Sequence, residues 1–271
     1  GRGPGIFDMK AGIVQAIYGV ASVKEWYHTE ILITSDEEVG SLASRALLEE
    51  RAKATGAVLV LEPSADGGAL KTARKGTGTF NVNITGRASH AGLEPEKGIN
   101  ALVELAAQVP RIAAIARPEV GTTVTPTVAK AGTADNVVPD SASIAVDVRC
   151  VLPEEKDRLE REMGKLTPTL AGARVEVSGG MNRPPLHESM TKELFAVAER
   201  VAKDFGINDL KGVAVGGGSD GNITAAVGVR TLDGLGAVGA GAHAETEHVR
   251  LDLMPERAAL VAGLVQAIVN S

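Results

Sequence analysis

Cysteine and aromatic residues are scarce in this 271-residue sequence, which has one cysteine and 3% aromatics. A single cysteine excludes a disulfide framework within the chain. Cys150 follows an alternating run over residues 143–148, so we predict a packed strand thiol rather than a reactive one. No stretch approaches the ~20 continuous apolar residues of a bilayer span, so we expect no membrane partner.

An excess of basic residues is also lacking. The 28 Lys and Arg residues are outnumbered by 34 Asp and Glu residues, and both signs are interspersed. Without a basic face to neutralise phosphates, nucleic acid is not an expected partner. Hydrophobic residues make up 44% of the chain, which is enough for a buried core in one large domain or two moderate ones.

The two ends of the chain show an α/β pattern. Apolar residues recur with helical spacing at 13–23, 41–54, 192–205 and 255–269. Short apolar runs, typical of parallel strands, lie at 30–34, 57–61, 213–215 and 229–231. We therefore predict one α/β domain formed by residues 1–75 and 184–271.

Residues 76–183 between these parts follow a different pattern. Strand-like segments at 79–85, 122–131, 143–149 and 173–178 are combined with helical stripes at 98–116 and 154–165. The order β-α-β-β-α-β suggests a ferredoxin-like α+β unit, with two helices on one face of an antiparallel sheet. We predict that this unit is inserted into the α/β domain.

Acidic residues in the α/β part lie beside the predicted elements. Asp8 precedes the first helix, Glu37 and Glu38 follow strand 30–34, and Glu62 follows strand 57–61. In an open α/β sheet, ligands gather where parallel strands end. Carboxylates delivered there would repel one another unless a cation lay among them. The pattern therefore predicts a divalent metal site.

His243 favours zinc over calcium or magnesium at that site, since imidazole nitrogen joins carboxylate oxygen in zinc centres. It lies in the glycine-rich segment GAGAHAETE. The adjacent residues Glu37 and Glu38 need two roles, because one can bind metal while the other takes a proton from the metal-bound water as general base. This combination is typical of metal-assisted hydrolysis.

Seven segments resemble, in order, the motifs of one family. They are GRGPGIFDMKAG, TSDEEVGS, VLEPS, ITGRASHAG, AGTADNVVPDSASIAVDVR, GGGSDGN and GAGAHAETEHV. Together they resemble the di-zinc exopeptidases that include glutamate carboxypeptidase (carboxypeptidase G), acetylornithine deacetylase, succinyl-diaminopimelate desuccinylase and aminoacylase. The resemblance covers almost the whole chain. It implies a mixed sheet flanked by helices, with an inserted lid and dimerisation domain.

The resemblance implies a role for each metal-site residue. Two zinc ions per subunit are expected, bridged by Asp8, with Glu38, Glu62 and His243 as further ligands and Glu37 as general base. Glutamate at the Glu62 position goes with carboxypeptidases and deacylases. Family members also carry a histidine, followed two positions later by an aspartate, well upstream of the Asp8 segment. No such pair precedes Asp8 here, so we expect that segment to be missing and full turnover to require it.

Substrate contacts are implied for residues of the inserted unit and of the glycine-rich turn. His90 would reach the partner subunit's active site in a homodimer and polarise the scissile carbonyl, with Asn136 and Arg149 near it. Arg183 would clamp the free carboxylate of the substrate. A salt bridge at a strand end is the alternative interpretation of Arg149. The same pocket would be lined by Gly217 and Ser219.

The expected reaction is hydrolysis of an amide bond next to a C-terminal amino acid, glutamate first, in a small peptide with a free carboxylate. Deacylation of an N-acyl amino acid is the close alternative. A non-catalytic dimeric protein that binds a carboxylated ligand is a third hypothesis. Nucleotide binding at residues 216–221 is disfavoured, because this turn lacks the lysine and the Ser/Thr of a phosphate-binding loop.

Overall fold

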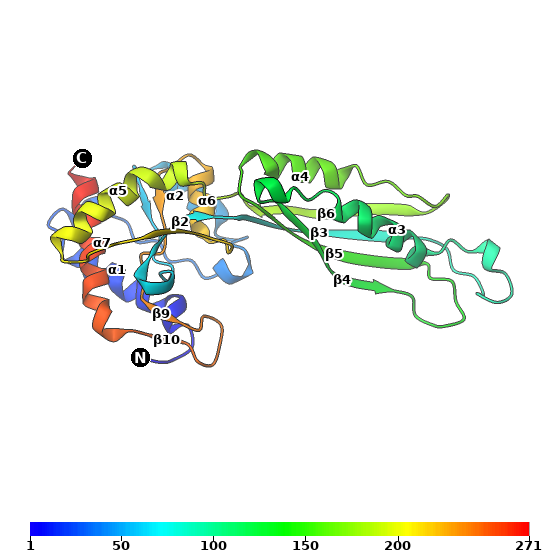
Figure 1. Ribbon diagram of the computed structural model, residues 1–271, viewed down its shortest axis with the longest axis horizontal. Coiled ribbons are helices and arrows are strands. Elements are labelled where there is room, and N and C mark those ends of the chain that lie inside the picture. The colour runs from blue at the N-terminus through cyan, green and yellow to red at the C-terminus, as the bar shows by residue number, and fades with distance from the viewer. Residues whose placement is uncertain (271) are drawn as a thin grey trace. The chain divides into compact units, whose positions relative to one another are not determined.

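The computed structural model describes residues 1–270 and separates into two compact units. Unit 1 consists of Gly1–Arg74 and Leu186–Ser271, and unit 2 is Lys75–Pro185. Figure 1 shows that each unit has its own helices and strands. None of the helices formed by residues 1–270 is long and apolar enough to cross a membrane.

Unit 1 combines helices with short strands, as predicted for an α/β domain. Its helices are α1 (Ala11–Ala21), α2 (Arg45–Lys53), α5 (Glu188–Asp204), α6 (Asp220–Ala226) and α7 (Met254–Val269). Its strands are β1 (Val58–Leu59), β2 (Leu70–Arg74), β7 (Gly212–Val215), β8 (Thr231–Leu232), β9 (Gly239–Ala240) and β10 (His248–Val249). Strands β1 and β8 pair in parallel, as do β2 and β7, whereas β9 and β10 are antiparallel.

The core of unit 1 is built mainly from leucines of the parallel strands and of helix α7. Leu70, Leu232, Leu260 and Leu264 are all fully buried in one cluster. Each buried leucine side chain contributes about 1.5–3 kcal/mol through the hydrophobic effect. Helix α1 packs closely on α7 at Gly19, where an added Cβ would lie only 2.9 Å from the carbonyl oxygen of Ala258. This contact fixes the last turn of α1 against α7.

Unit 2 is a four-stranded antiparallel sheet with two helices. Its elements are β3 (Gly76–Thr85), α3 (Ala101–Ala113), β4 (Thr123–Ala131), β5 (Ser141–Cys150), α4 (Glu154–Gly164) and β6 (Arg174–Arg183). The strand order is β4-β5-β3-β6, and every neighbouring pair is antiparallel. The order of elements along the chain is the predicted β-α-β-β-α-β, and the strand order is that of a ferredoxin-like sheet.

One face of the unit 2 sheet is buried and the other is exposed. Phe80, Val82 and Ile84 on β3 are buried in one cluster with residues of α3 and α4, while the alternate residues Thr79, Asn81 and Asn83 are exposed. This alternation follows from the two-residue period of a strand. Cys150, at the end of β5, is a fully buried free thiol, and burial raises its pKa to about 11.

The predicted helices are all present, but the predicted strand at residues 30–34 is wrong. This segment forms no strand, and among residues 1–270 no strand pairs with it. Its apolar side chains are exposed, Ile31 by 42% and Ile33 by 61%. A strand needs backbone hydrogen bonds to a neighbour, so the apolar run alone does not produce one. Strand β2 and the short helix α6 were not predicted.

Candidate metal centre

Asp8, Glu38 and His243 converge on one point in unit 1. His243 Nε2 lies 3.2 Å from Asp8 Oδ2 and 3.4 Å from Glu38 Oε2. One ligand atom from each residue lies within 4.8 Å of the other two. The negative charge of Glu38, together with the hydrogen bond to Asp8, raises the pKa of His243. Two carboxylates and an imidazole at this spacing are a donor set that suits a divalent metal ion.

Glu247 fixes the backbone that carries Asp8. Its carboxylate accepts hydrogen bonds from the N–H groups of Gly5 at 2.6 Å, Phe7 at 2.9 Å and Asp8 at 2.9 Å. The bond from the Asp8 N–H is the main reason that the pKa of Glu247 is lowered. Glu247 lies four residues after His243, so one short segment holds both Asp8 and its partner in the cluster.

Helix α1, which begins just after Asp8, approaches the end of β1 closely. The contact is at Gly12, where an added Cβ would lie 2.1 Å from the carbonyl oxygen of Leu61. Only glycine permits this approach. The helix is therefore held beside Glu62, whose carboxylate is within electrostatic reach of Asp8.

Glu37 and Glu38 lie in a 3₁₀ turn, Glu37–Val39, which ends at Gly40 with φ at 96°. Thr34 and Ser41 flank this turn, and both hydroxyls donate to the carboxylate of Asp220 in the first turn of α6. These bonds tie the turn to α6. Glu38 contacts His243, whereas the half-buried Glu37 lies within electrostatic reach of Arg74. The bend therefore gives the two adjacent glutamates different surroundings.

Glu62 is buried in a network of charges beside the three converging residues. Arg74 Nη2 donates to Glu62 Oε2 at 3.3 Å, and Arg74 also binds Asp233 through Nε at 2.7 Å and Nη2 at 3.1 Å. Burial, and then the negative charge of Asp233, raises the pKa of Glu62 to about 8. Glu62 is not among the three residues whose ligand atoms lie within 4.8 Å. Its assignment as a metal ligand stays a prediction.

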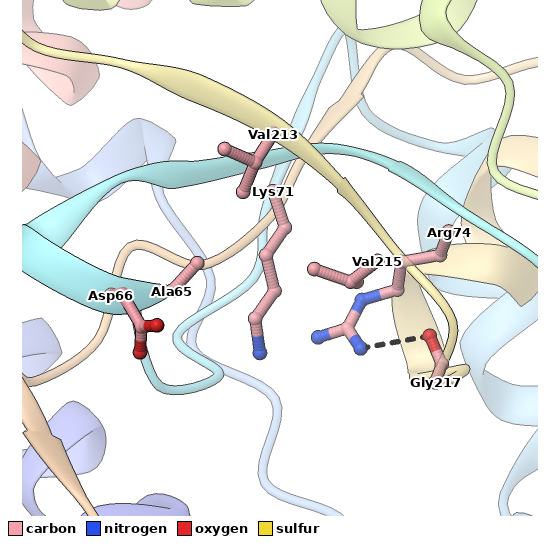
Figure 2. A pocket seen from close by; sticks show the side chains of 7 residues that line it. All are labelled: Ala65, Asp66, Lys71, Arg74, Val213, Val215 and Gly217. Carbon is pink, nitrogen blue, oxygen red and sulfur yellow. Dashed lines mark hydrogen bonds between the residues drawn. The ribbon is translucent and has the colours of Figure 1, made fainter.

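Gly217 and Ser219 belong to the same charge network. The carbonyl of Gly217 accepts from Arg74 Nη1 at 3.1 Å (Figure 2). Ser219 is fully buried, caps α6 and donates its hydroxyl to Asp233 Oδ2 at 2.5 Å. The structure therefore gives Ser219 a role in holding Asp233, and its expected contact with the substrate stays a prediction.

His90 and Asn136 lie together in unit 2. The N–H of Ala91 donates to the backbone oxygen of Asn136 at 2.9 Å, and His90 forms an isolated bridge with Val137. The Nδ1 atom of His90 accepts from the N–H groups of Gly92 and Leu93. In the neutral ring the proton is therefore on Nε2, which can donate.

Arg149 and Arg183 lie at the opposite end of the unit 2 sheet. Both pair with Thr77, near the start of β3, whereas His90 follows the end of that strand at Thr85. The eight residue-to-residue steps from Thr77 to Thr85 span about 27 Å. Within one chain β5 therefore carries Arg149 to the end of the sheet opposite His90. The expected place of Arg149 near the His90 contact concerns a dimer and stays a prediction.

The two arginines differ in their surroundings. Arg149 forms a two-bond ion pair with Asp147, with the closest contact at 2.8 Å, which matches the alternative interpretation of this residue. Arg183 is 8% exposed and therefore buried. Its expected contact with a substrate carboxylate stays a prediction.

Three residues of the site were not identified from the sequence: Arg74, Asp233 and Glu247. Arg74 and Asp233 are 159 positions apart, and Gly5 and Glu247 are 242 apart. No local pattern signals such pairings. The only available signal was the position of Glu247 within the segment GAGAHAETE that also contains His243.

The chain belongs to peptidase family M20/M25/M40, whose model matches residues 2–267. It is 34% identical to carboxypeptidase G2 from Pseudomonas sp. (strain RS-16) over 280 residues, or 97% of this chain. It spans 66% of the length of that relative.

Solved structures share the fold. The aminopeptidase PepT from Bacillus cereus matches 96% of this chain and 70% of its own, with a TM-score of 0.77 and 24% identity. The Bacillus subtilis YXEP protein, described as a dinuclear metal-binding peptidase of the M20 family, matches 87% of this chain and 63% of its own, with a TM-score of 0.59 and 17% identity. These neighbours establish a mixed α/β fold of the M20 type for this chain.

Proposed function

We propose that this chain belongs to a zinc enzyme that hydrolyses the amide bond next to a C-terminal amino acid, glutamate first. The convergence of Asp8, Glu38 and His243 in a chain of this peptidase family carries the proposal. Two zinc ions per subunit are proposed, and Asp8, Glu38, Glu62 and His243 would hold them. When bound, zinc supplies Lewis-acid activation of the attacking water and of the scissile carbonyl.

Glu37 is proposed as the general base. It takes the proton from the attacking water and returns it to the nitrogen of the leaving amine. Its half-buried position in the turn next to Glu38 supports this role, because Glu38 lies close to Asp8 and His243 whereas Glu37 is not one of the converging residues. The 34% identity to carboxypeptidase G2 supports a carboxypeptidase, and the resemblance of ITGRASHAG and GGGSDGN to glutamate carboxypeptidase supports glutamate as the C-terminal residue of the substrate.

Unit 2 is proposed as a lid and dimerisation domain. His90 and Asn136 are separated from Arg149 and Arg183 by about 27 Å of sheet, so one small substrate cannot touch both groups of a single chain. We propose that each site combines Arg183 of one subunit with the His90 ring of the other, whose Nε2–H donates to the scissile carbonyl oxygen.

Two measurements test the proposed centre. Zinc titration of the purified chain, followed by calorimetry, should show binding that is weakened at least about tenfold in His243→Ala and unchanged in Glu37→Ala. Any hydrolysis of a C-terminal glutamyl amide by the zinc-loaded chain should be lost in Glu37→Ala. Equal zinc affinity in His243→Ala contradicts the metal centre, and an unchanged rate in Glu37→Ala contradicts the general base.

N-acyl amino acids are the comparison substrates, because deacylation would use the same zinc and base. The rate on N-acetyl amino acids should be lower than the rate on glutamyl amides at equal concentration. A higher rate on the acetylated substrates would assign the chain to the deacylases instead.

A further inference from the structure

A cavity of about 430 Å³ opens beside Arg74 within unit 1. Its volume lies in the range of small-molecule sites. Figure 2 shows the side chains that line it, which come from the segment after Glu62, from β2, from β7 and from the glycine-rich turn. They are Ala65, Asp66, Lys71, Arg74, Val213, Val215 and Gly217.

An irregularity in β2 places two cations on the same side of this cavity. Residues three apart in a regular strand point to opposite faces. Between Lys71 and Ala73 the register with β7 shifts by one residue, since these pair with Val213 and Ala214. The extra residue turns the strand locally, and both Lys71 and Arg74 extend into the cavity (Figure 2).

The two cations differ in their bonding. All three nitrogens of the Arg74 guanidinium already donate, to Asp233, Glu62, Gly217 and Gly218. The ammonium of Lys71 is half-buried, and among residues 1–270 no hydrogen bond or ion pair to it is found. Burying a cation without a bonded partner costs free energy, and a bound anion offsets this cost. Lys71 is therefore the cation in this cavity that can still bind a ligand.

The remaining walls indicate what kind of anion fits. Val213, Val215 and Ala65 present apolar side chains that can pack against methylene groups. The one acidic lining residue, Asp66, is exposed, so water screens its charge. A short aliphatic chain ending in a carboxylate matches both the apolar walls and the ammonium of Lys71 better than a compact inorganic anion does. Lys71 is also within electrostatic reach of Asp8 and Glu62, which places the cavity next to the candidate metal centre.

We propose that this cavity binds the side-chain carboxylate of an acidic residue, with Lys71 as its ionic partner. The inference rests on the proposed function, because it assigns this acidic residue to the C-terminal position of the substrate. It adds a specificity-determining residue, Lys71, on strand β2.

Equilibrium binding of L-glutamate and L-glutamine tests the cavity without any hydrolysis. The two ligands have nearly the same shape and differ in one charge. The zinc-loaded chain should bind glutamate about tenfold more tightly, as expected for one charge-assisted hydrogen bond. Lys71→Met, which keeps the aliphatic stem, should reduce this ratio to about one, and Lys71→Arg should largely retain it. Thermal melting verifies that each variant is folded.

The matched control is Lys53→Met, which removes the same charge from an exposed position at the end of α2. It should leave the glutamate preference unchanged. A wild-type chain without the preference, or a preference that survives in Lys71→Met, overturns the proposal. Glutamyl hydrolysis with an intact preference in Lys71→Met rejects the cavity but not the enzyme. If the chain prefers glutamate through Lys71 but hydrolyses no amide, the cavity is supported and the proposed enzyme activity is rejected.

Discussion

Arg74 binds two buried acidic side chains at once, those of Glu62 and Asp233. All three side chains are buried, Asp233 completely. Removing one partner of a buried ion pair leaves an uncompensated charge, and the cost exceeds the net stabilisation that the pair provides. The arrangement around Glu62 therefore depends on a single arginine.

Replacing Arg74 by methionine should lower the free energy of unfolding by about 3–5 kcal/mol. The reason is that the buried Asp233 carboxylate, which Arg74 binds through two nitrogens, would lose its cation, and Glu62 would lose a hydrogen-bond donor. Chemical denaturation of the intact chain at pH 7 measures the change. Arg51→Met is the control, since Arg51 pairs with Glu30 at an exposed position, and it should change stability little. Equal effects of the two substitutions would contradict the role given to burial.

Single residues show what sequence reasoning could find at this site. The carboxylates and the histidine were identifiable because each stands beside a predicted element or in a glycine-rich loop, and three of them meet in the structure. Their supporting partners were not identifiable. Arg74 and Lys71 lie on strand β2, LKTAR, in which polar and apolar residues do not alternate as they do in a half-buried strand.

Helix α4 is tied to the start of β4 through one buried carboxylate. Glu155 accepts from Arg158 Nε at 2.7 Å on its own helix and from the Thr122 hydroxyl at 2.8 Å, one residue before β4. The Arg158 bond is the main reason that the pKa of Glu155 is lowered. A lowered carboxyl pKa means that the stabilisation is complete above the unfolded-state value of about 4.3.

Glu155→Gln should therefore destabilise unit 2 at pH 7 by about 2 kcal/mol, the contribution typical of hydrogen bonds to a charged group. The difference from the wild type should disappear as the pH falls through the pKa of Glu155 in the folded protein, because both side chains are then neutral. Denaturation curves from pH 7 down to about pH 3 measure this. A difference that is constant across the range would contradict the assignment.

Elements with a clear period were predicted well, and those without one were not. The alternating β3 and the striped α3 have a buried face that their sequences specify. The run at 30–34 has consecutive apolar residues, which would lie on both faces of a strand, so its pattern predicted burial rather than exposure. Burial of such a strand requires a neighbouring strand, and none of the described strands pairs with it.

The whole molecule must be a dimer if His90 and Arg183 serve one substrate, and complementation tests this. His90→Ala and Arg183→Ala should each abolish turnover alone. A mixture in equal amounts should recover about a quarter of the wild-type activity, since half of the dimers are mixed and each mixed dimer has one intact site. A mixture as inactive as its components would contradict sharing of the site.

Alkylation of the buried Cys150 thiol reports how often unit 2 unfolds around this residue. With no second cysteine in the sequence and a pKa of about 11, alkylation at neutral pH must wait until β5 separates from its neighbours. The alkylation rate measured across a urea series should follow the unfolding of unit 2 and stay unaffected by Arg74→Met. Rapid alkylation of the native protein would show that β5 unfolds locally while the rest of the protein remains folded.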